Sequence, residues 1–123
     1  AGVDLRSVED RKISHRETAK IGLGVAIAIP EDTVGWLTGR SSTALSLGLL
    51  THEGRIDAGY RGQIHAIVTA LDGDVQINRG ERIAQLVIVK IAYPGDRLTP
   101  WQVVPELDKT TRGAMGLGST GRD

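Results

Sequence analysis

The chain has 123 residues, in which 15 Lys and Arg balance 15 Asp and Glu, with 16 Gly and no Cys. This length predicts one domain with a modest core and excludes a core plus a separate cofactor domain. The zero net charge excludes general attraction to nucleic acid or acidic membranes, and the lack of Cys excludes disulfides and thiolate metal sites.

Four stretches have the pattern of β-strands. Residues 20–29 alternate large aliphatic side chains with small or polar ones, and residues 34–38, 63–71 and 82–91 are also strand-like. The last stretch is almost continuous in Leu, Ile and Val, which is typical of a strand covered on both faces. Turn residues at 72–74 and 78–80 separate the later strands.

Only residues 42–47 predict a helical turn. Ser41 or Ser42 could cap it, and Ala44, Leu45 and Leu47 could bury one face. The elements together predict an all-β fold, an antiparallel barrel or sandwich with one short helix.

The composition changes near residue 94. Prolines at 94, 100 and 105 interrupt regular structure, and residues 112–123 contain four glycines and a single Leu. We therefore expect a β core over residues 1–93 and a flexible Gly-rich C-terminal arm over residues 94–123. The arm is either disordered or becomes ordered on a ligand or a neighbouring subunit.

Two clusters have the composition of phosphate sites. In residues 112–121, Arg112 precedes closely spaced glycines and the hydroxyls of Ser119 and Thr120, and glycine-rich backbone can turn its N–H groups toward an anion. A P-loop is excluded, because Ser119 stands where that motif needs Lys. The second cluster joins Arg40 to Ser41 and Ser42, and its alternative reading is an ordinary helix cap beside a solvated Arg.

One carboxylate is placed for hydrolytic chemistry. Asp57 lies between apolar strand residues and a glycine turn, and Tyr60 follows three residues later. A hydrolase of phosphoanhydrides needs a carboxylate near a water and cations near the phosphates. An Asp that only starts a hairpin turn is the alternative.

Gln85, among apolar residues, requires a polar partner, either a ligand oxygen or a backbone carbonyl.

Five segments in order resemble the trimeric dUTPase family. They are residues 1–7 (AGVDLRS), 39–42 (GRSS), 54–62 (GRIDAGYRG), 80–85 (GERIAQ) and 112–121 (RGAMGLGSTG). Each is weak alone, but the set spans nearly the whole chain. Residues 34–42 look closer to viral and retroelement members.

The resemblance implies a dUTPase-like β-clip, or distorted jelly-roll barrel, that assembles as a homotrimer. Each active site would draw on all three chains, with the arm exchanged onto a neighbouring subunit. The implied reaction is hydrolysis of dUTP to dUMP and pyrophosphate. Mg²⁺ is the implied cofactor, held by the substrate phosphates and water rather than directly by the protein.

The resemblance also implies residue roles. Asp57 would activate the attacking water, Asp4 would support the site near the metal's water shell, and Tyr60 would pack beneath the deoxyribose. The hairpin over residues 50–56 would read uracil through its backbone. The implied substrate-binding residues are Arg40, Ser41, Ser42, Thr51, Gly54, Ile56, Tyr60, Gln85, Arg112, Gly116, Leu117, Gly118, Ser119 and Thr120.

Three positions depart from the family pattern. Leu117 stands where the family usually stacks an aromatic ring on uracil, Met115 replaces a usual Gly, and Thr51 stands where many cellular members use Asn. A missing ring predicts weaker dUTP binding or a less ordered arm.

Two alternatives use the same fold. A dCTP deaminase needs a Glu about ten residues after the Asp, but that position is Ile67 here, which disfavours it. A regulatory protein that binds nucleotide with weak catalysis is the other. We expect no direct nucleic-acid partner and no membrane association, and a soluble, intracellular or virion-associated protein.

Overall fold

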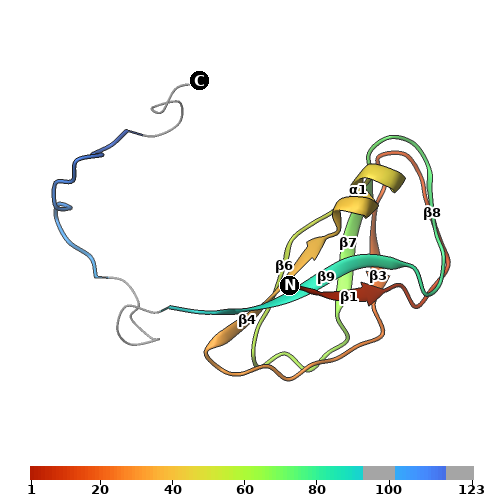
Figure 1. The fold of residues 1–123 in the computed structure, drawn as a ribbon, viewed down its shortest axis with the longest axis horizontal. Helices are drawn as coiled ribbons and strands as arrows, with labels where there is room; N and C mark the ends of the chain where they lie inside the picture. The colour runs from red at the N-terminus through yellow and green to blue at the C-terminus, as the bar shows by residue number, and fades with distance from the viewer. Residues whose placement is uncertain (93–101, 116–123) are drawn as a thin grey trace. The chain divides into compact units, whose positions relative to one another are not determined.

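The computed structural model describes residues 1–92 and 102–115. The chain divides into two units, residues 1–92 and 93–123. The first contains every helix and strand that the structure describes (Figure 1). No helix in the described ranges is both long and apolar enough to cross a membrane.

The strands of the first unit form three antiparallel sheets (Figure 1). The largest has the order β1-β9-β4-β6, the second pairs β2 with β8, and the third has the order β3-β7-β5. The prediction of an all-β fold with one short helix is confirmed. The bounds are β1 Val3–Arg6, β2 Arg11–Ile13, β3 Thr18–Gly22, β4 Thr33–Gly39, α1 Ser41–Leu47, β5 Leu49–Thr51, β6 Gly54–Ile56, β7 His65–Ala70, β8 Val75–Ile77 and β9 Arg82–Lys90.

The core between these sheets is aliphatic. Strands such as β7 bury alternate side chains, which places one face of the sheet against the interior. Burial of these side chains supplies most of the favourable free energy of folding. The largest fully buried ones are Ile13, Ile21, Leu37, Leu49, Ile64, Ile77, Ile83 and Val68.

The strand predicted over residues 20–29 is shorter than expected. The ladder between β3 and β7 ends at Gly22, and Gly24 has a φ of +68° that a strand cannot continue through. Val25 and Ile27 still pack against the core, so the alternation reflected real one-sided burial. The alternating pattern identified the side chains that face the core, but it did not reveal that the strand ends at Gly22.

The helix begins one residue earlier than predicted, and it differs in what it buries. Arg40, not a serine, is the N-cap residue, and its side chain makes no capping hydrogen bond. Thr43 is the buried residue of α1, whereas Ala44 and Leu45 are exposed. Leu47 packs partly against the core as predicted, but the prediction is wrong for Ala44 and Leu45, whose place on the inner face Thr43 takes.

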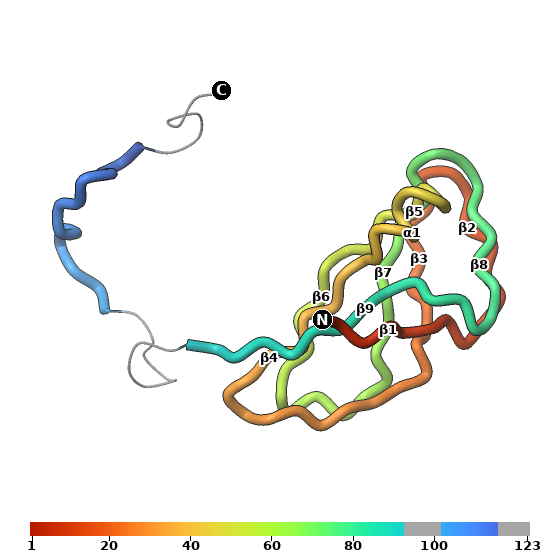
Figure 2. The backbone as a smooth tube through the Cα atoms, viewed as in Figure 1, coloured from red at the N-terminus to blue at the C-terminus, as the bar shows by residue number. Residues whose placement is uncertain are grey.

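Two further predictions need correction. β9 is covered on both faces only as far as Leu86, and Ile88 beyond it is exposed. The segment over residues 50–56 was predicted as a hairpin, but β5 pairs with β7 while β6 pairs with β4. The two residues between β5 and β6 therefore form a corner between two sheets. Figure 2 follows the same path through the Cα atoms.

The described part of the second unit, residues 102–115, contains no helix or strand. Its one clear turn is closed at Gly113, whose N–H donates to the carbonyl and the hydroxyl of Thr110, both at 3.1 Å. Gly113 adopts a φ of +54°, which glycine tolerates without strain.

Candidate active site

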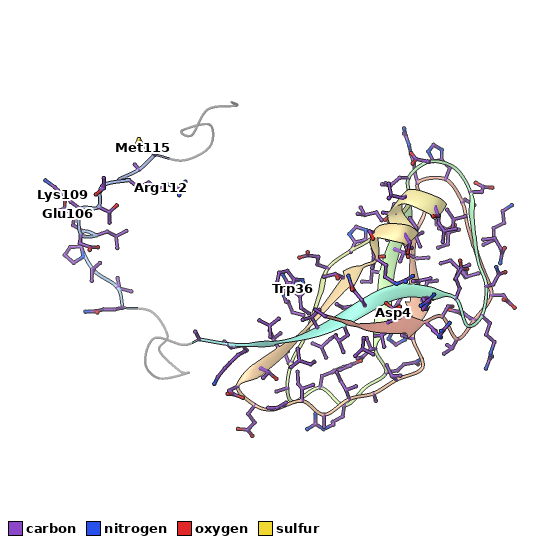
Figure 3. All side chains as sticks on the ribbon, viewed as in Figure 1. Asp4, Trp36, Glu106, Lys109, Arg112 and Met115 are labelled. Carbon is purple, nitrogen blue, oxygen red and sulfur yellow. The ribbon has the colours of Figure 1, made fainter. Side chains whose placement is uncertain are left out.

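A carboxylate shared by two arginines marks one end of the large sheet. The Arg40 Nε donates to Asp4 Oδ1 at 2.9 Å, and the Arg82 Nη1 donates to Asp4 Oδ2 at 3.3 Å. The Asp4 and Arg40 side chains are 33% and 22% exposed, so solvent screens this pair only partly. Figure 3 shows Asp4 on β1, the strand that pairs with β9. Asp4 thus fixes both guanidinium groups side by side.

Strand register brings these residues together. β9 lies between β1 and β4, with Gln85 opposite Asp4 on one side and Thr38 on the other. Arg40 follows directly after β4 and reaches back across the sheet edge to Asp4. The Gln85 Nε2 donates to the carbonyl of Gly39 at 3.0 Å. A backbone carbonyl is therefore the partner of its amide nitrogen.

A cavity of about 260 Å³ opens beside this cluster. The hydroxyls of Ser41 and Ser42 are exposed and make no hydrogen bond among the described residues. Guanidinium groups and hydroxyls are donors suited to phosphate oxygens. The lining residues are Arg40, Ser42, Thr43, Ser46, Leu47, Glu81 and Arg82.

Sequence reasoning did not single out Arg82 as a site residue. Besides contacting Asp4, its carbonyl accepts hydrogen bonds from Arg40 Nη1 at 3.4 Å and from the Thr43 hydroxyl at 3.5 Å. The only signal in the sequence was a charged residue at the start of an apolar strand. The pairing of β1 with β9, which joins residues 78 positions apart, is what gives Arg82 its place.

A second cavity, of about 240 Å³, contains the other predicted carboxylate. Asp57 follows β6, and its carbonyl accepts the N–H of Tyr60 at 3.0 Å, which closes a turn. Within residues 1–92 and 102–115 the Asp57 carboxylate has no hydrogen bond or ion pair. The cavity is lined by Arg55, Ile56, Asp57, Tyr60, Gln63, Ile64 and His65.

The ring of Tyr60 is fixed at the edge of this cavity. Its hydroxyl donates to the carbonyl of Gln63 at 2.9 Å, and its ring lies close against the backbone of Gly62. A side chain at position 62 would collide with that ring. The tyrosine is 43% exposed, so one part of it remains available to a ligand.

The two clusters lie at opposite ends of β4. Ile56, next to Asp57, pairs with Gly35, whereas Arg40 lies five residues further along the chain. Five residues of extended chain span roughly 17 Å. Arg40 and Asp57 of one chain are thus too far apart to act on the same phosphorus atom.

The residues predicted to read the base lie at the corner between the sheets. The Thr51 hydroxyl is buried and donates to the carbonyl of Ile83 at 3.3 Å. Gly54 pairs with Leu37, and Ile56 packs partly against the core. With the Thr51 hydroxyl engaged inside the protein, the three residues Thr51, Gly54 and Ile56 can offer a ligand mainly their backbone groups.

The arm residues are only partly described. The Arg112 Nε donates to the carbonyl of Met115 at 3.1 Å. The predicted positions Gly116, Leu117, Gly118, Ser119 and Thr120 lie outside the described residues.

The acidic and histidine side chains of the described residues fit a metal ion that is bound mainly by a ligand. In the described ranges, no three or more His, Asp or Glu side chains gather into a metal-binding group. Asp4 is the carboxylate of the arginine cluster, and both of its oxygens contact guanidinium groups. Mg²⁺ usually keeps several waters and is bound together with substrate phosphates, so Asp4 would meet such an ion through its water shell.

These groups suit a hydrolase of phosphoanhydrides. Paired cations can hold phosphates, and an unpaired carboxylate in a separate cavity can hold a water, on an all-β scaffold. The sequence model of the dUTPase family matches residues 1–121.

Curated relatives extend this match. The deoxyuridine 5'-triphosphate nucleotidohydrolase of Corynebacterium glutamicum is 45% identical to this chain, over 99% of the chain and 81% of that protein. The protein of the same name from Paramecium bursaria Chlorella virus 1 is 38% identical, over 98% of the chain and 83% of its own length. Relatives are therefore both cellular and viral.

Solved structures share the fold. The dUTPase of Staphylococcus bacteriophage 80alpha with dUPNHPP superposes with a TM-score of 0.87 at 33% identity, covering 98% of this chain and 86% of that one. A mutant dUTPase of phage phi11 of S. aureus, which coordinates a structural Mg(II) ion, has a TM-score of 0.78 at 31% identity, covering 89% and 86%. The chain belongs to the dUTPase family.

Proposed function

We propose that this chain hydrolyses dUTP to dUMP and pyrophosphate. The observation that carries the proposal is the Asp57 carboxylate, which is unpaired in the described structure and lines a cavity with Tyr60. Membership of the dUTPase family supports the choice of substrate. The reaction would limit uracil incorporation into DNA and would supply dUMP.

Asp57 orients a water and takes its proton. The water oxygen attacks the α-phosphorus, and the bond from that phosphorus to the oxygen bridging to the β-phosphate breaks in line with it. Pyrophosphate leaves with that bridging oxygen. A carboxylate is a weak base near neutral pH, so its contribution comes largely from positioning the water.

The arginine end of β4 binds the phosphates. Arg40, Ser41, Ser42 and Gln85 donate to phosphate oxygens, and Arg40 stabilises the negative charge that develops in the transition state. Asp4 keeps the Arg40 guanidinium in place before substrate arrives. Prior placement of this charge avoids reorganisation during the reaction.

The corner over residues 50–56 reads the base. Thr51, Gly54 and Ile56 contribute mainly backbone donors and acceptors, which suit the N3–H and O4 of uracil and mismatch cytosine. Tyr60 packs beneath the deoxyribose and leaves no room for a 2′-hydroxyl.

Mg²⁺ would arrive with the triphosphate, held by the phosphate oxygens and by water, and would supply neutralisation of the phosphate charge. Asp4 would help to order its water shell. No residue of the chain needs to ligate the metal directly.

A homotrimer would complete each site. Because Arg40 and Asp57 of one chain are separated along β4, the phosphate end of one subunit meets the Asp57 cavity of another. The core over residues 1–93 would supply both ends. The arm over residues 94–123 would cross to a neighbour, where Arg112 and the residues Gly116, Leu117, Gly118, Ser119 and Thr120 enclose the nucleotide.

The test is pyrophosphate release with Mg²⁺ and dUTP, dTTP, dCTP or UTP as separate substrates. Release from dUTP alone is expected. Ammonia from dCTP would point to a deaminase, and tight binding of dUTP without turnover would point to a regulatory protein.

The Asp57→Asn variant is the internal test. It keeps the size of the side chain but removes the base, so kcat should fall by about 10²- to 10⁴-fold while dUTP still binds. Asp74→Asn, a matched change in the β2–β8 sheet, should leave kcat unchanged. Equal activity of Asp57→Asn and wild type would refute the role of this carboxylate.

A further inference from the structure

Asp57 has an arginine within easy reach that it does not contact. Arg55 lies in β6, and Asp57 follows it two residues later, directly after the strand ends. Both line the same cavity. An extended arginine covers that separation, and an ion pair would occupy the carboxylate oxygens that a water needs.

Instead, Arg55 is held by other groups. Its guanidinium carbon lies 4.6 Å from the centre of the Trp36 ring, and its Nη2 contacts the Glu53 carboxylate at 3.1 Å. Arg61, the other nearby arginine, donates to the carbonyls of Ala58 and Tyr60 at 2.7 and 2.9 Å. Neither guanidinium group contacts the Asp57 carboxylate.

The register of β4 with β6 explains the place of Trp36. The strands have three paired positions, and the pairs Gly35 with Ile56 and Leu37 with Gly54 each include a glycine. Trp36 opposite Arg55 is therefore the one pair of the ladder formed by two side chains. Trp36 is 37% exposed, and Figure 3 shows its side chain projecting from the sheet.

We infer that Trp36 is a positioning residue that holds the Arg55 guanidinium over its ring and so keeps the Asp57 carboxylate open to water. This inference rests on the proposed role of Asp57 as the group that activates the water. Glu53 acts in the same direction from the corner, as a second partner for Arg55.

The other groups that face the Asp57 cavity are Tyr60, Gln63 and His65. His65 is the one of these that can gain a positive charge near neutral pH. His65 is present in every variant of the test, so it cannot cause a difference between them.

The first experiment compares Trp36→Leu, Arg55→Gln and the double variant. In Trp36→Leu the released Arg55 pairs with Asp57, and kcat should fall by about two- to fivefold, the factor that an exposed cation–π contact represents. Arg55→Gln is the reference for the double variant, which should have the same kcat as Arg55→Gln, because no cation remains to block Asp57 when Trp36 is changed. Trp36→Phe, which retains a ring, should lie between wild type and Trp36→Leu.

The Arg55 side chain can also be released without changing a residue of the sheet. Glu53→Gln removes the exposed partner of Arg55 and should lower kcat in the same direction but less than Trp36→Leu. Thermal unfolding of each variant identifies those that fold as the wild type does.

The second readout needs no substrate. Titration of the Asp57 carboxyl by NMR, without nucleotide, should give a lower pKa in Trp36→Leu than in wild type, and the wild-type pKa in the double variant. If the wild type released no pyrophosphate, the proposed function would fail while this titration still judged the Trp36 contact. The inference is overturned if Trp36→Leu lowers kcat by the same factor in the Arg55→Gln background as in the wild type, or if it leaves the Asp57 titration unchanged.

Discussion

The two ends of β4 use the same residue type in opposite ways. At one end, Asp4 contacts the guanidinium groups of Arg40 and Arg82. At the other, Asp57 has no partner among the described residues, although Arg55 and Arg61 lie close to it in the chain. The neighbours of a carboxylate decide whether it serves as a fixed counter-charge or stays open to a water.

The contrast also separates stability from reactivity. A carboxylate shared by two arginines orders their guanidinium groups, whereas an unpaired one contributes little to folding and remains available for chemistry. In the proposed trimer, neither end of one chain forms a complete site. The first two predictions below act on the phosphate end and leave the Asp57 end unchanged.

Next to Asp57→Asn, the largest effect is expected at the phosphate end. Arg40→Ala removes the guanidinium that stabilises transition-state charge, so kcat/KM for dUTP should fall by about 10²- to 10³-fold. Steady-state pyrophosphate release measures it. Arg11→Ala, which removes an exposed arginine paired with Glu17, should leave activity unchanged. Equal losses in the two variants would mean that the Arg40 effect is not local.

A smaller effect is expected from Asp4→Asn. The amide keeps the shape of the carboxyl but loses the charge that holds Arg40 and Arg82, so both guanidinium groups become less ordered. A charge-assisted hydrogen bond of about 1.5 kcal/mol corresponds to a loss in kcat/KM of roughly tenfold. Unchanged kinetics in Asp4→Asn would show that the arginines keep their places without it.

The sequence predicted the long strands and the chemistry better than the arrangement of the site. β4, β7 and β9 were recognisable because seven, six and nine residues are enough to show a repeating pattern. β1, β2, β5, β6 and β8 have only three or four residues each, too few for periodicity. Their places come from long-range pairing.

The site shows the same limit. Arg40 and Asp57 could be singled out because each stands in a distinctive local motif. The contact of Arg82 with Asp4 could not, since it depends on the register of β1 with β9. The contact of Trp36 with Arg55 could not be predicted either, because it depends on the register of β4 with β6. The type of a side chain can be read directly from the sequence, whereas strand register depends on residues far apart in the chain.

A gain of binding is expected at the arm. Leu117→Phe restores a ring that can stack on uracil, and a stack worth about 1 kcal/mol would lower KM for dUTP by roughly fivefold. Leu117→Ile, which adds no ring, is the matched control. The same KM in wild type and Leu117→Phe, with an unchanged rate, would refute stacking at this position.

The smallest effect concerns stability outside both ends. The N–H of His15 donates to Asp74, and this bond, with the nearby Lys12 ammonium, holds the pKa of the Asp74 carboxyl below its ordinary value of 3.8. A lowered carboxyl pKa contributes stability that is present above the unfolded value and is lost as pH falls through the folded one. Asp74→Asn should therefore lower Tm slightly at pH 7, with the difference vanishing in acid. A difference of constant size across that range would rule out this electrostatic origin.

The most direct test of the account mixes two inactive variants, Asp57→Asn and Arg40→Ala, by refolding them together. If each site takes its carboxylate from one chain and its arginine from another, random trimers from equal amounts should regain about a quarter of the wild-type dUTPase activity. Separately refolded variants, mixed without exchange, should stay inactive. No recovery in refolded mixtures that form mixed trimers would contradict an active site shared between chains.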